Sequence, residues 1–140
     1  LLARKLGADF GLNPQKEDIR KEVEALTQGR GADVAFEVVG ISDTVKTAIS
    51  AVRKGASVTL VGNLSPGVEI PLQAVVTRQL RLQGSCAICG EYPAVLDMIA
   101  RKAVDVDAIL SAEAPLSEGA EWFKRLYDKE AGLIKVVLKP

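Results

Sequence analysis

Two short apolar segments, each ending in a Val-Gly pair, constrain the fold of this chain more than any other feature. They are residues 33–40 (DVAFEVVG) and residues 56–63 (ASVTLVGN), and an amphipathic segment lies between them. Short runs rich in β-branched residues are typical of parallel strands whose two faces are covered by helices. Ligands of open parallel sheets bind beyond the carboxyl ends of the strands. The sequence therefore predicts an α/β fold with a ligand site close to the two Val-Gly pairs.

The region before these strands lacks a feature that nucleotide-binding α/β domains normally carry. No glycine-rich phosphate loop precedes them, and the chain opens at Leu1 inside a segment typical of the end of a helix. We therefore expect the 140 residues to be a fragment, the second half of a nucleotide-binding domain.

The composition argues against several classes of function. Hydrophobic residues make up 48% and charged residues 26% of the chain, as in ordinary globular proteins. Basic and acidic residues number 18 each, so no net charge attracts nucleic acid or an acidic membrane, and we expect neither as a partner. No apolar run approaches the ~20 residues that span a bilayer. No signal-peptide pattern opens the chain, so we expect a cytoplasmic protein.

The chain contains no histidine. Histidine is the commonest side chain for proton transfer near neutral pH and a frequent zinc ligand. We therefore expect no catalytic side chain and no metal site in these residues, and any such chemistry would reside elsewhere in a larger enzyme.

Helical and strand patterns alternate along the chain and predict a mostly parallel sheet flanked by helices. Ser42 and Ser117 are the expected N-caps of two helices. In the last helix Ala120, Phe123 and Tyr127 share one face. The predicted helices are residues 1–6, 16–27, 42–55, 71–77, 93–102 and one after 117; the predicted strands are residues 9–12, 34–39, 57–61, 80–84 and 133–138.

Five segments carry a resemblance to a known family. They are residues 3–9 (ARKLGAD), 29–40 (GRGADVAFEVVG), 54–62 (KGASVTLVG), 80–85 (LRLQGS) and 132–140 (GLIKVVLKP). In this order and at this spacing, they resemble the medium-chain dehydrogenases of the zinc-dependent alcohol dehydrogenase superfamily. The match extends over nearly the whole chain, and polyol dehydrogenases (sorbitol or iditol) and threonine dehydrogenases look like the nearer branches.

The resemblance implies what the fragment contains and what it lacks. Residues 1–140 would be a partial Rossmann domain without its first strand, glycine-rich loop, first helix and second strand. The family's catalytic domain, whose zinc polarises the alcohol, would be absent too. The complete enzyme would transfer hydride between a small alcohol or polyol and NAD or NADP, and the fragment alone would be inactive. Because the missing strands would leave a strand edge unpaired, we also expect a homo-oligomer.

The resemblance also implies cofactor-binding residues at three strand ends and near the C-terminus. The first strand end would lie beside the ribose groups, the second along the nicotinamide and the third beneath it, while a basic residue of the last strand would reach the pyrophosphate. Tight packing of strand ends and a solvated lysine are the structural alternatives. The residues are, in that order, Val38, Val39 and Gly40; Val61, Gly62 and Asn63; Ser85, Cys86 and Ala87; and Lys135.

Cys86 and Cys89 form a Cys-x-x-Cys pair, a spacing found in redox and zinc sites. Two thiols cannot complete a four-ligand zinc site, and no histidine or third cysteine is available. We expect two reduced, partly buried thiols.

Glu37 is an acidic residue inside an apolar strand, and a buried carboxylate needs polar partners. The sequence predicts a structural hydrogen-bond acceptor near the site, with no catalytic role.

Two other functions remain open from the sequence. One is a zinc-independent quinone or enoyl reductase of the same superfamily. The other is a non-enzymatic α/β regulatory module, for example a flavodoxin-like domain.

Overall fold

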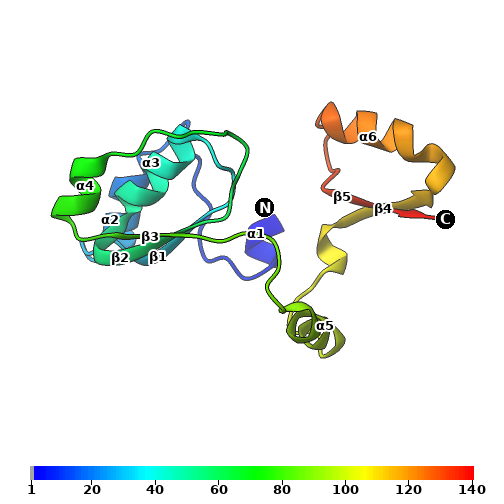
Figure 1. The fold of residues 1–140 in the computed structure, drawn as a ribbon, viewed down its shortest axis with the longest axis horizontal. Helices are drawn as coiled ribbons and strands as arrows, with labels where there is room; N and C mark the ends of the chain where they lie inside the picture. Colours follow the sequence, from blue (N-terminus) through cyan, green and yellow to red (C-terminus); the bar gives the residue numbers. More distant parts are fainter. Residues whose placement is uncertain (1) are drawn as a thin grey trace. The chain divides into compact units, whose positions relative to one another are not determined.

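The computed structural model describes residues 2–140 and divides the chain into two compact units. One unit is Leu12–Ala87; the other combines Leu1–Gly11 with Ile88–Pro140 (Figure 1). Leu1, the start of the first predicted helix, lies outside the described residues.

The unit Leu12–Ala87 is built on a three-stranded parallel sheet. Its strands are β1 (Ala32–Glu37), β2 (Val52–Leu60) and β3 (Arg81–Gly84), hydrogen-bonded in the order β1-β2-β3. Its helices are α2 (Ile19–Leu26), α3 (Ser42–Ala51) and α4 (Leu72–Thr77). Helix α3 packs on β1 and β2, and α2 packs on α3. The α/β fold with parallel strands flanked by helices is therefore confirmed.

The core of this unit lies between α3 and β2. Val45 and Ile49 of α3 are buried against Val52, Ala56 and Val58 of β2. The two α3 residues are four positions apart, so they lie one above the other on the same side of the helix. Burial of apolar side chains between a helix and a sheet is the main stabilising term for such a unit.

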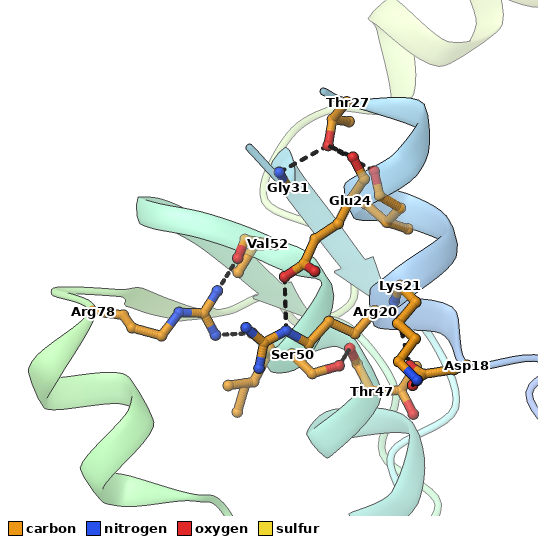
Figure 2. Close-up of polar contacts among 12 residues, drawn as sticks. Asp18, Arg20, Lys21, Glu24, Thr27, Gly31, Thr47, Ser50, Val52 and Arg78 are labelled. Atoms are coloured by element: carbon orange, nitrogen blue, oxygen red, sulfur yellow. Dashed lines mark hydrogen bonds and ion pairs between the residues drawn. The ribbon is translucent and has the colours of Figure 1, made fainter. Parts of the chain in front are cut away.

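Polar contacts fix both ends of α2 (Figure 2). The Asp18 carboxylate accepts from the backbone N–H of Lys21 at 3.3 Å, a normal N-cap. At the other end, the Thr27 hydroxyl donates to the Val23 carbonyl and accepts from the Gly31 N–H at 2.8 Å. These caps make α2 shorter at both ends than the predicted helix 16–27.

Arg78 connects α4 to the end of α3. Its guanidinium donates to the carbonyls of Ile49, at 2.9 Å, and Val52 (Figure 2). The last carbonyls of a helix have no partner within the helix. A side chain from the next helix satisfies them here and holds α4 beside the start of β2.

The second unit contains a smaller parallel sheet of two strands, β4 and β5. Ala114 of β4 is buried, and a Cβ atom added to Gly119 would lie 3.1 Å from the Leu138 side chain of β5. The elements of this unit are α1 (Leu2–Lys5), α5 (Tyr92–Ala100), η1 (Asp107–Ile109), β4 (Leu110–Pro115), η2 (Leu116–Glu118), α6 (Gly119–Tyr127) and β5 (Lys135–Lys139).

Four local predictions are wrong. The helix predicted over residues 42–55 ends at Ala51, and residues 52–55 belong to β2. Residues 9–12 form no strand, because no neighbouring strand is hydrogen-bonded to them among the described residues. Ile41 is the N-cap of α3, and the Ser42 hydroxyl instead accepts from the Glu69 N–H at 3.0 Å. Ser117 lies within the 3₁₀ turn η2, so Glu118 takes the position before α6.

Helix α6 exposes the face that its sequence pattern makes apolar. Phe123 and Tyr127 are 72% and 87% exposed. Trp122 is half-buried instead: its indole N–H donates to Glu118 at 3.2 Å, and the Arg125 guanidinium lies 4.0 Å from the ring centroid.

Within residues 2–140, no helix has the length and apolar character needed to cross a membrane.

Candidate functional site

The carboxyl ends of β1, β2 and β3 lie side by side at one edge of the sheet. Glu37, Leu60 and Gly84 are partners across the last rung of the three strands. Because the strands are parallel, the segments that follow them leave the sheet together. The sheet thus brings together nine of the ten predicted cofactor-binding residues, which follow the three strands directly: Val38, Val39 and Gly40; Val61, Gly62 and Asn63; Ser85, Cys86 and Ala87.

The turns after β1 and β2 are in direct backbone contact. A Cβ atom on Gly62 would lie 2.2 Å from the Gly40 nitrogen and 2.3 Å from the Val39 backbone. A Cβ atom on Gly40 would lie 2.4 Å from the Asn63 nitrogen, and Gly40 also has a φ of +84°. No side chain fits at those distances. Mutual packing of the strand ends therefore requires glycine at both positions, with or without a ligand.

Backbone hydrogen bonds join these two turns. The N–H groups of Val61 and Gly62 donate to the Glu37 carbonyl at 2.8 and 3.0 Å. Further along, the Leu64 N–H donates to Val39 and the Ser65 N–H to Gly40. The two segments therefore move as one piece.

The side chain of Glu37 lies beneath the first turn and is 3% exposed. Its carboxylate accepts from the N–H groups of Val39 and Gly40 at 2.9 Å and from the Thr44 hydroxyl at 2.7 Å. Burial alone would raise the pKa of Glu37, but the bonds from Gly40, Thr44 and Val39 outweigh it and lower the pKa. The predicted structural acceptor is confirmed, and its partners are now identified.

This lowered pKa predicts a pH dependence of stability. A carboxylate with a lower pKa in the folded state stabilises the fold above its unfolded pKa, and that contribution is lost as the pH falls through the folded pKa. We expect the free energy of unfolding to decrease on acidification below the ordinary value of 4.5, and to decrease less in Glu37→Gln. Urea titrations at several pH values measure this difference.

A matched control for the pH experiment is Glu22→Gln, which removes an exposed carboxylate from the same unit. This variant should follow the wild-type pH profile. A Glu37→Gln profile parallel to that of the wild type would contradict the prediction.

A pocket of about 490 Å³ opens between the ends of β2 and β3. This is within the range of small-molecule sites. Its lining contains six of the predicted cofactor-binding residues, together with Leu60 and Gly84: Val61, Gly62, Asn63, Ser85, Cys86 and Ala87.

The backbone around this pocket offers unused donors and acceptors. Among the described residues, the N–H groups of Asn63, Cys86 and Ala87 donate to no protein acceptor. The carbonyls of Val61 and Ser85 likewise accept no bond there. A ligand group that both donates and accepts hydrogen bonds, such as a carboxamide, suits this lining.

Two polar contacts attach the loop after β2 to the first turns of α3. The Ser42 hydroxyl accepts from the Glu69 N–H, and the Lys46 ammonium pairs with the Glu69 carboxylate at 2.7 Å. The hydrogen bond from Lys46 is the main cause of the lowered pKa of Glu69. The sequence analysis missed this attachment, because the partners are 23 positions or more apart.

The two cysteines are free and both exposed, so their predicted reduced state agrees with the structure and their predicted partial burial is wrong. Cys86 lines the pocket after β3. Lys135 begins β5 in the other unit, where it is exposed.

Thr44 is a site residue that the sequence analysis missed. Its hydroxyl binds Glu37 from the first turn of α3, seven positions along the chain. One sequence signal could have identified Thr44. It is a hydroxyl residue in the first turn of the helix that follows a strand ending in an acidic residue.

The described residues contain no group of three or more His, Cys, Asp or Glu side chains placed to hold a metal ion. These residues therefore offer no ligand set for zinc.

The parallel strands, the crossover helices and a pocket beyond the strand ends together define a Rossmann-type ligand-binding fold. Comparison with known proteins then gives the family. The sequence profile of the zinc-binding dehydrogenases matches residues 1–101, and the chain belongs to this family.

Curated relatives and solved structures agree with this assignment. Sorbitol dehydrogenase of Ovis aries is 31% identical over 140 residues, which are 98% of this chain and 39% of the relative. The crystal structure of 2R,3R-butanediol dehydrogenase from Bacillus subtilis has a TM-score of 0.88 and 28% identity, covering 99% of this chain and 40% of that one. A zinc-binding dehydrogenase from Sinorhizobium meliloti 1021, described as putative and solved bound to NADP, has a TM-score of 0.83 and 28% identity, covering 99% of this chain and 41% of that one. The chain thus spans about 40% of the length of these proteins.

Proposed function

We propose that these residues form the nicotinamide-binding part of an NAD- or NADP-dependent dehydrogenase that acts on a small alcohol or polyol. The observation that carries the proposal is the pocket lined by Val61–Asn63 and Ser85–Ala87, with its unused backbone donors and acceptors. Family membership supports it, as do the sorbitol and butanediol dehydrogenases among the relatives. The same membership argues against a non-enzymatic regulatory module.

The reaction needs a donor of hydride and an acceptor. A bound nicotinamide cofactor would supply a hydride acceptor for the alcohol carbon; the alcohol would become a carbonyl compound and its hydroxyl proton would leave to solvent. Residues 61–63 and 85–87 would hold the carboxamide and so orient the ring. Val38–Gly40 would border the ribose, and Lys135 would supply a positive charge to the pyrophosphate. No residue of this chain takes a proton in the proposal, and the zinc would be held by residues outside it.

Binding of NADH tests this proposal. The longest natural polypeptide that contains these residues should give a saturable enhancement of NADH or NADPH fluorescence. Replacing Ser85 by Tyr fills the pocket, so S85Y should weaken binding by at least about tenfold. The isolated 140 residues should not oxidise alcohols with NAD.

Ser117→Tyr is the matched control, because Ser117 is exposed in η2 of the other unit. It should bind NADH like the wild type. Equal affinity of the S85Y and S117Y variants would contradict the position of the site, and absence of NADH and NADPH binding by the folded wild type would contradict the function.

We also propose that the isolated residues self-associate through the β1 edge. Strand β1 is one of the two outer strands of the described three-stranded sheet, and Val34 and Phe36 on it are exposed. Unpaired strand edges readily pair with another chain.

A cytoplasmic location stays a prediction from the sequence.

A further inference from the structure

We infer that Glu37 is a positioning residue for the cofactor site, an inference that rests on the proposed function. It touches no ligand atom in this scheme. It acts through the two turns that follow β1 and β2.

Glu37 accepts hydrogen bonds from four backbone N–H groups of the two turns. Its carboxylate accepts from the N–H groups of Val39 and Gly40, and its carbonyl accepts from those of Val61 and Gly62. One residue thus connects the segment proposed to border the ribose to the segment proposed to orient the nicotinamide.

Apolar side chains of the first turn contribute little to holding it in place. The side chains of Val38 and Val39 are exposed, so they contribute little apolar burial. The position of this turn therefore depends on its backbone contact with the turn after β2 and on polar contacts, among them those of the Glu37 carboxylate. Buried hydrogen bonds to a charged acceptor are the stronger kind and are well suited to fixing a backbone.

The negative charge of Glu37 lies close to the start of α3. A helix N-terminus favours a negative group and often binds a phosphate. Here the Glu37 carboxylate lies beside the start of α3, bonded to the Gly40 N–H before the helix and to the Thr44 hydroxyl in its first turn. An anionic ligand group is repelled from this turn. We therefore expect an uncharged part of the dinucleotide, such as a ribose, to lie beside this turn.

The chemistry of the substitutions follows from these contacts. A glutamine at position 37 has one acceptor oxygen, and its amide nitrogen would face N–H donors, so Glu37→Gln loses at least one bond to the turn. Thr44→Val removes only the hydroxyl bond, whereas Thr44→Ser keeps it.

The experiment measures the NADH dissociation constant of the longest natural polypeptide and of four variants. We expect about tenfold weaker binding for Glu37→Gln and about threefold for Thr44→Val. Thr44→Ser and the exposed-site control Glu22→Gln should stay within about twofold of the wild type. Circular dichroism at the assay temperature establishes that each protein is folded.

The outcomes separate this inference from the proposed function. Unchanged NADH affinity in a folded Glu37→Gln protein, even with a lower melting temperature, would overturn the positioning role and leave the function standing. If Glu37→Gln does not fold, equal affinities of the valine and serine variants at position 44 would overturn it. If the folded wild type binds neither NADH nor NADPH, the proposed function itself is wrong.

Discussion

Replacing Gly62 by alanine should destabilise the unit Leu12–Ala87 by at least about 3 kcal/mol, because the new methyl group has no space. Its Cβ would lie 2.2 Å from the Gly40 nitrogen, and the nearby atoms are all backbone. Backbone cannot rotate away as a flexible side chain does, so the two turns must separate and lose their shared hydrogen bonds. Chemical denaturation followed by circular dichroism measures the change.

Gly67→Ala is the control for this experiment. Gly67 lies in the same loop, a Cβ atom added to it would meet nothing within 4 Å, and its φ is not positive. Alanine there should leave stability unchanged or raise it by about 0.5 kcal/mol, because it restricts the unfolded chain. Similar effects of G62A and G67A would show that the two strand ends are not packed as described. Gly40→Ala should be at least as harmful as G62A, since it adds a strained φ of +84° to the clash.

Ile49→Ala should destabilise the same unit by about 3 kcal/mol. Ile49 is 1% exposed and packs in the cluster formed by α3 and β2. The substitution removes three carbon atoms from a closed core and leaves a cavity that the fixed sheet cannot fill by relaxation. The loss should appear as a lower urea midpoint with an unchanged slope.

Ile70→Ala makes the same chemical change at a side chain that is 41% exposed, so it should cost less than about 1 kcal/mol. Equal losses at positions 49 and 70 would contradict the core assignment. Neither residue lines the pocket, so both variants should keep the NADH affinity of the wild type as long as they are folded.

Local pattern was sufficient to predict most of the elements. The helix at 71–77 and the strand at 80–84 appear as α4 and β3 with boundaries within one residue. Short apolar runs and turn residues act over a few positions, so the neighbouring sequence contains the information that fixes them. The strand ends can likewise be located from their own residues.

The N-cap of α3 and the absence of a strand at residues 9–12 were not predictable from the neighbouring sequence. Ser42 has the side chain of an N-cap, yet its hydroxyl is occupied by the N–H of Glu69, which reaches it from a distant loop. Residues 9–12 have a strand-like pattern but no hydrogen-bonded neighbour among the described residues. In both places the outcome depends on a partner that lies far away in the sequence.

The burial of the residues of the last helix was not predictable from the local pattern either. The spacing of Ala120, Phe123 and Tyr127 correctly places them on one face of α6, but that face is exposed at Phe123 and Tyr127. Periodicity identifies which residues share a face, and only the tertiary structure decides whether another element covers it.

By itself, the sequence determined that a Val-Gly pair follows each of two strands, and it predicted a ligand site at their carboxyl ends, because strand signals and turn residues are local. Only the tertiary structure decided why those residues are glycines and what the buried acid does. Gly40 and Gly62 pack backbone against backbone, and Glu37 holds both turns. The contacts between the two turns join residues 22 to 25 positions apart (Gly40 with Gly62, Glu37 with Gly62), and such contacts form only when the strands pair.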